Sequence, residues 1–82
     1  MIGLKPPYAE AREKLASAIQ AGTLTPEAPI EGNQPAVESV CGWDSQDWVE
    51  LMLWSEELPA QLTTVGDVLK LLEEIGSRYQ QP

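Results

Sequence analysis

The sequence contains 82 residues, with 13 Asp or Glu, 5 Lys or Arg and a formal net charge of −8 at pH 7. This length allows one small domain, residues 1–82, and the 43% apolar share is sufficient for a packed core. The negative charge disfavours nucleic-acid binding, while the lack of His and the single Cys exclude a His-dependent catalytic triad and a cluster of the usual zinc ligands.

Apolar runs in this sequence are short compared with a membrane span. Residues 1–22 also lack the uninterrupted apolar core and the small-residue cleavage pattern of a secretory signal. We therefore expect a cytoplasmic protein without a membrane span. We also expect it to be a monomer.

The first predicted helix runs from Pro7 to Ala21. Proline is well tolerated at a helix entrance, and Gly22 is a suitable stop just past the last turn. Four apolar residues recur at helical spacing and are expected to share the face toward the core: Ala11, Leu15, Ala18 and Ile19.

A loop is predicted from Thr23 to Ala36, because three prolines, a glycine and an asparagine interrupt any periodicity there. Leu24 and Ile30 could still reach back to the core. A short helical turn is expected near Val37–Cys41.

The next helix is expected to begin at Asp44 or Ser45, either of which can accept a hydrogen bond from the free first-turn amides, and to end at Pro59. Its apolar residues occupy more than one face. One set is expected to face the core: Val49, Met52 and Leu53. A second set must then face partly elsewhere: Trp48, Leu51 or Trp54.

The last helix is predicted to begin after Thr64 and to run to about Tyr79. Thr64 and Asp67 have the spacing of a capping box. The apolar residues that follow have helical spacing: Val65, Val68, Leu69, Leu72 and Ile75. The connection from Leu58 is short, so the last two helices should be neighbours. The sequence thus predicts an all-α fold, a small bundle of three to four helices.

Residues 37–51, VESVCGWDSQDWVEL, resemble the attachment region of the acyl carrier and peptidyl carrier proteins. In that family a Gly, a variable residue and an Asp-Ser pair open the second helix, followed by an acid and then by Val-Glu-Leu. Residues 62–68, LTTVGDV, resemble the start of the family's last helix. The residues in register with the first motif are Gly42, Asp44, Ser45, Asp47, Val49, Glu50 and Leu51.

The resemblance implies a stand-alone carrier protein rather than an enzyme. Ser45, next to Asp44, would receive a 4′-phosphopantetheine arm from coenzyme A through a phosphopantetheinyl transferase. The thiol of that arm would hold an acyl or amino-acyl group as a thioester, in fatty-acid-like, polyketide or other specialised biosynthesis. A helix start suits an attached phosphodiester, because free amides and the positive end of the helix dipole favour an anion.

The resemblance also implies a docking surface on the acidic second helix for acyl-loading, condensing or tailoring enzymes with basic patches. The alternative is a solvated helix face. The candidate docking residues are Asp47, Glu50, Glu56 and Glu57.

The sequence departs from the family at three places. Gln46 replaces the apolar residue that usually follows the modified serine. The connection from Leu58 to Thr64 is too short for the family's third helix, which should be shortened or missing. The long proline-bearing loop could fill the resulting gap. These departures favour short or polar cargo.

Two further interpretations remain open from the sequence. Asp44 and Ser45 could serve only as a helix cap. The chain could also be an acidic adaptor or inhibitor with a carrier-like fold, no enzymatic activity and no arm, which binds a basic partner. Beside the motif, Trp43 could anchor the core or stack over an arm, and Cys41 is expected to be a buried apolar residue.

Overall fold

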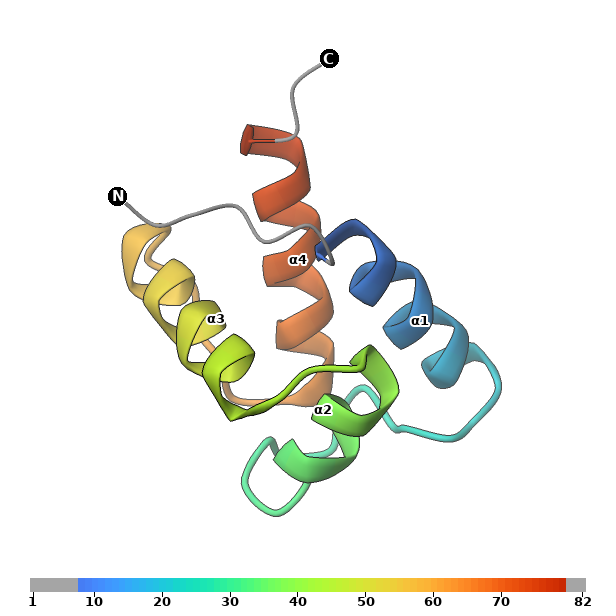
Figure 1. Cartoon of the computed structure of the whole chain (residues 1–82). Coiled ribbons are helices and arrows are strands. Elements are labelled where there is room, and N and C mark those ends of the chain that lie inside the picture. The colour runs from blue at the N-terminus through green and yellow to red at the C-terminus, as the bar shows by residue number, and fades with distance from the viewer. Residues whose placement is uncertain (1–7, 80–82) are drawn as a thin grey trace.

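The computed structural model of the chain describes residues 8–79. This part folds into four α-helices: α1 (Tyr8–Gln20), α2 (Gln34–Cys41), α3 (Ser45–Glu57) and α4 (Val65–Tyr79). α1 packs against α2 and α4, and α3 packs against α4, which stands between α1 and α3 (Figure 1). The predicted all-α bundle is confirmed.

The core is built around α4 and the facing side of α1. The two predicted apolar stripes are confirmed, although Ile19 and Leu69 are only partly buried at the edge of the core. On α4 the buried residues are Val65, Val68, Leu71, Leu72 and Ile75, and on α1 they are Tyr8, Ala11, Leu15 and Ala18. In the described part of the chain, none of the helices combines the length and apolar content that crossing a membrane needs.

The loop between α1 and α2 is tied to the start of α4. The Ile30 amide donates to the Thr63 carbonyl over 2.8 Å, and the amides of Val65 and Gly66 donate over 2.9 Å to the Ala28 and Pro26 carbonyls. Helix starts leave such amides without partners, so these carbonyls complete the first turn of α4. The loop thereby covers the beginning of the last helix.

The boundaries of α2 differ from the sequence prediction. The helix begins at Gln34, so residues 34–36 are helical rather than part of the loop, and the expected turn near Val37–Cys41 is a full helix. Pro35 lies in its first turn, where a missing amide donor costs little. Residues 58–64 contain no helix, as expected from the length of this connection.

The predicted orientation of α3 is wrong. Trp48, Leu51 and Trp54 are buried, with exposed fractions of 5%, 0% and 3%. The set predicted to face the core is exposed instead: Val49 (54%), Met52 (47%) and Leu53 (45%). Both sets have helical spacing, but the two indole rings bury more apolar area than the smaller side chains can.

Two leucines on α3 provide a matched test of this orientation. We expect Leu51→Ala to lower the free energy of unfolding by about 2–5 kcal/mol, because it leaves a cavity in the core. Leu53→Ala should change it by less than about 0.5 kcal/mol, because this side chain lies on the exposed face of the helix outside the core. Urea unfolding followed by tryptophan fluorescence measures both values, and equal losses would contradict the orientation.

Asp67 stabilises the start of α4 in a way that depends on pH. Its carboxylate accepts hydrogen bonds from the amides of Thr63 (3.0 Å) and Thr64 (3.1 Å), and these bonds lower the pKa of Asp67. A lowered folded-state pKa stabilises the fold above the unfolded-state value of about 3.9, and this stabilisation is lost as the pH falls through the folded-state value.

We therefore expect Asp67→Ala to lower the free energy of unfolding by about 1 kcal/mol at pH 7, and the difference from wild type to shrink in acid. Urea unfolding of the variant and of wild type at neutral and acidic pH measures this difference. Glu73→Ala, at an exposed position of the same helix, is the control. A deficit that stays constant with pH would show that the carboxylate charge is not responsible.

Candidate functional site

A three-residue turn, residues 42–44, links α2 to α3 and carries the candidate serine to the surface. Gly42 caps α2 with a left-handed backbone (φ 71°, ψ 31°), a conformation that other residues rarely adopt. Its amide donates to the Ser39 carbonyl, and the Trp43 amide donates to the Glu38 carbonyl. This pattern is a Schellman motif, which ends α2 and reverses the chain.

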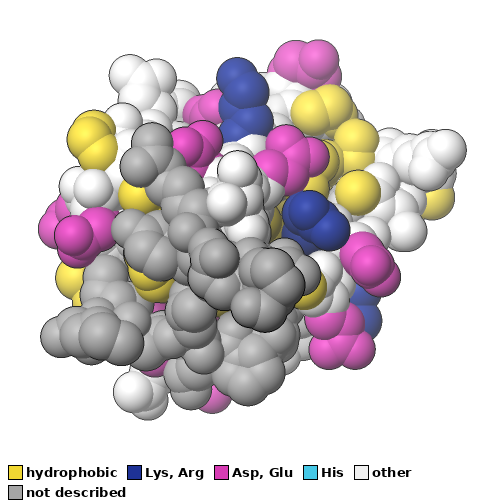
Figure 2. Space-filling view, turned by 90° about the horizontal axis from the view of Figure 1, so that it is seen from above, with side chains coloured by type: hydrophobic (Ala, Val, Ile, Leu, Met, Phe, Trp, Pro, Cys, Tyr) yellow, Lys and Arg dark blue, Asp and Glu magenta, His cyan; other side chains and the backbone are white. Residues whose placement is uncertain are grey.

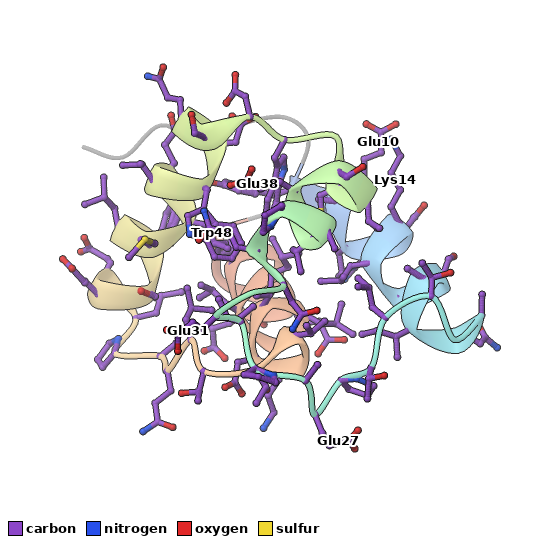
Figure 3. All side chains as sticks on the ribbon, turned by 90° about the horizontal axis from the view of Figure 1, so that it is seen from below. Glu10, Lys14, Glu27, Glu31, Glu38 and Trp48 are labelled. Atoms are coloured by element: carbon purple, nitrogen blue, oxygen red, sulfur yellow. The ribbon has the colours of Figure 1, made fainter. Side chains whose placement is uncertain are left out.

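Two buried side chains anchor the turn on either side of Gly42. Cys41 is 3% exposed, and its Sγ lies 3.9 Å from the Ala11 carbonyl oxygen on α1. Trp43 is 7% exposed and meets Tyr8 edge to face, with ring centroids 6.3 Å apart. Trp43 is therefore a core anchor, as the first of the two interpretations expected. Trp48 also points inward from α3 (Figure 3).

Asp44 is the N-cap of α3. One carboxylate oxygen accepts from the Asp47 amide at 2.9 Å, and the Asp47 carboxylate accepts from the Asp44 amide at 3.2 Å. This is a complete capping box, which fixes the first residue of the helix at Ser45. Of the two residues that the sequence offered as caps, Asp44 alone has this role.

Ser45 is exposed at the first position of α3. Within the described residues, neither its hydroxyl nor the amides of Ser45 and Gln46 have a hydrogen-bond partner. The start of α4 differs, because residues of the loop between α1 and α2 accept from its first amides. The Ser45 hydroxyl is thus accessible, beside two amides that can interact with an attached anion.

The four candidate docking acids occupy two different environments. Asp47 and Glu50 are half-buried: Asp47 takes part in the capping box, and Glu50 has one buried carboxylate oxygen. Glu56 and Glu57 are exposed near the end of α3. The structure therefore does not bring the four acids together into one exposed surface.

Tyr8, at the beginning of α1, has a raised pKa. Burial, and after it the charge of Glu50, raise the pKa of Tyr8 to about 12. Burial likewise raises the pKa of the Cys41 thiol to about 12, although the nearby Lys14 ammonium opposes the shift.

An open groove of about 660 Å³ lies at the far end of α3. Leu58 is 13 residues from Ser45, which corresponds to about 20 Å along a helix. Apolar and charged side chains both line the groove: Leu58, Pro59, Ala60, Gln61, Asp67, Lys70, Leu71, Glu73, Glu74 and Ser77. It is too open and too polar to enclose a long alkyl chain.

Comparison with known proteins identifies no relative of this chain. The chain matches no protein-family model, and searches of curated proteins and of solved structures find no match.

The Cys41 environment predicts a thiol that is inert in the folded protein. A buried thiol with a pKa near 12 is almost entirely protonated at pH 8, and the thiolate is the reactive form. We expect Ellman's reagent to react with Cys41 at least about a hundredfold more slowly in the native protein than in urea. Fast reaction without denaturant would contradict the burial. The urea-unfolded chain is the matched control, because Cys41 is its only cysteine.

Proposed function

We propose that this chain is a stand-alone carrier protein whose Ser45 hydroxyl bears a 4′-phosphopantetheine arm. The observation that supports the proposal is that Asp44 and Ser45 have different roles at the start of α3. Asp44 supplies the cap, so the helix needs nothing from Ser45, yet Ser45 is exposed in the register of the carrier motif. A plain helix cap accounts for Asp44 but not for the neighbouring serine.

The residues around Ser45 fit a phosphodiester. The Ser45 and Gln46 amides can donate to its oxygens, and the N-terminal end of the helix dipole favours the added negative charge. The buried anchors Cys41 and Trp43 hold the turn in place, so the attachment point is rigid while the arm is flexible. When attached, the arm supplies the thiol that holds cargo as a thioester.

The modification is a phosphoryl transfer by a phosphopantetheinyl transferase. The Ser45 Oγ forms a bond to the phosphorus that carries the pantetheine of coenzyme A, and the pyrophosphate bond of coenzyme A breaks. The serine proton is lost and adenosine 3′,5′-bisphosphate leaves. The chain itself serves as the substrate in this reaction, and no residue of its own is required as a catalyst.

The cargo is proposed to be short or polar. The groove near Leu58 is open to solvent and lined in part by charged residues. It would shield little of a long acyl chain from water. Acyl-loading, condensing or tailoring enzymes with basic patches are the proposed partners, in a specialised biosynthetic pathway in the cytoplasm.

The alternative function is an acidic adaptor or inhibitor with the same fold and no arm. Gln46 favours it, because the carrier family places an apolar residue after the modified serine. In this alternative Ser45 is dispensable, and the charges on α3 determine binding to a basic partner.

Incubation with coenzyme A and phosphopantetheinyl transferases of broad specificity separates the two functions. We expect the intact mass of the wild type to increase by one phosphopantetheine unit and that of Ser45→Ala to stay constant. Ser39→Ala, at another exposed serine, should still be modified. Ser45→Ala should keep its free energy of unfolding within about 0.5 kcal/mol of wild type, because Asp44 supplies the cap.

Two results would overturn the carrier function. One is a wild type that stays unmodified with every transferase while it remains folded. The other is modification of Ser45→Ala to the same extent as wild type.

A further inference from the structure

A phosphate attached to Ser45 would lie between two carboxylates. Asp44 precedes the serine and Asp47 follows it in the same helical turn, where both take part in the capping box. Charges of like sign repel, so the phosphate of the proposed arm adds a negative charge where two are already present. The amides of Ser45 and Gln46 offset part of this repulsion. A cation close to the turn would offset more of it.

Few cations are available near this turn. The sequence contains no Lys or Arg at residues 15–69, so α2, the turn and α3 contribute none. On the described surface seen from above, the few basic side chains lie among more numerous acidic ones (Figure 2). Lys70 lines the groove at the far end of α3, together with three acidic residues. Among the described helices, α1 is the one that brings a cation to the turn.

This cation is Lys14, which lies on the side of α1 next to the end of α2 (Figure 3). Its Nζ is 4.0 Å from the position that a Cβ on Gly42 would occupy. Ser45 follows Gly42 by three residues, so their Cα atoms are at most about 11 Å apart. Lys14 is exposed and its side chain is flexible, so its ammonium can move toward an anion on the serine. Arg12 is two positions earlier and thus on nearly the opposite side of α1.

Lys14 also complements the end of α2. That helix has no basic residue in its last turn, and Lys14 brings a positive charge from α1 to this negative helix end. The role is purely structural and does not depend on modification of Ser45. A phosphate on Ser45 carries a full charge, whereas the helix end carries a partial one, so the phosphate attracts the ammonium more strongly at equal distance.

We propose that Lys14 is a binding residue for the phosphate on Ser45. The inference rests on the proposed attachment of an arm at this serine. The Lys14 ammonium approaches the phosphate oxygens from α1, while the Ser45 and Gln46 amides donate to them from α3. This contact draws the first part of the arm toward α1.

Phosphoserine at position 45, incorporated during translation, tests the contact without a transferase. The second ionisation of its phosphate, with an ordinary pKa of about 6, is followed by ³¹P NMR. A neighbouring cation favours the dianion and so lowers this pKa. We expect the titration midpoint to be at least about 0.3 pH unit lower with Lys14 than with Lys14→Gln at low salt. The difference should shrink in about 1 M salt, which screens the two charges from each other.

Two variants of the phosphoserine protein serve as controls. Lys70→Gln removes the same charge at the far end of α3 and should move the midpoint by less than about 0.1 pH unit. Lys14→Arg keeps the charge and should keep the lowered midpoint. Urea unfolding isolates the structural role of Lys14: Lys14→Gln lowers the midpoint urea concentration equally in the unmodified and phosphorylated chains if it acts on α2 alone, and more in the phosphorylated chain if it also binds the phosphate.

Either of two results excludes the contact in chains that remain folded. One is a phosphate midpoint that is the same with Lys14 and with Lys14→Gln. The other is an equal change in Lys70→Gln, which would show an effect of net charge alone. These results are independent of the carrier function, because coenzyme A and a transferase test that function on the wild type. An arm on the wild type with equal midpoints would keep the carrier function and exclude the Lys14 contact. A wild type that no transferase modifies, with a midpoint that depends on Lys14, would do the reverse.

Discussion

The rest of the structure depends on which face of α3 packs into the core. This helix has apolar residues around most of its circumference, but it can bury only one face. Trp48, Leu51 and Trp54 occupy that face. Because a helix is rigid, this choice puts Ser45 on the outward face and turns the Glu50 carboxylate partly inward. The packing of this one face therefore determines both the exposure of Ser45 and the exposure of Val49, Met52 and Leu53.

The first amides of α3 and of α4 lack acceptors within their own helices, and the two helix starts differ in which groups accept from them. Each has an acidic residue three positions after its cap that reaches back to a free amide: Asp47 in α3 and Asp67 in α4. At α4 the loop carbonyls of Pro26 and Ala28 then accept from the first amides of the helix. At α3 no described residue accepts from the amides of Ser45 and Gln46, although the Asp44 carboxylate accepts from the amide of Asp47. The two ends thus have similar sequence patterns, and the tertiary structure leaves just one of them accessible to a ligand.

The sequence predicts a helix and its buried face correctly where that helix has a single apolar stripe. α1 and α4 were predicted closely for this reason. In α3 the spacing allows two stripes, and periodicity cannot choose between them; the larger apolar area of Trp48 and Trp54 does. Likewise, Asp44 and Ser45 are equally good caps in isolation, and only the hydrogen bonds assign that role to Asp44. The extent of α2 was missed because residues typical of turns obscure its periodicity.

The hydrogen bonds between the long loop and the start of α4 also divide the molecule topologically. The Ile30–Thr63 hydrogen bond and the Pro29–Thr64 bridge bring the two ends of residues 30–63 side by side, at a separation of about 5 Å between paired Cα atoms. Residues 30–63 contain all of α2, the turn and α3. This segment leaves the α1–α4 pair and returns to it at the same place. Residues 30–63 could therefore be exchanged as one segment without rebuilding the α1–α4 pair, provided that the contacts of this segment with α1 and α4 are kept.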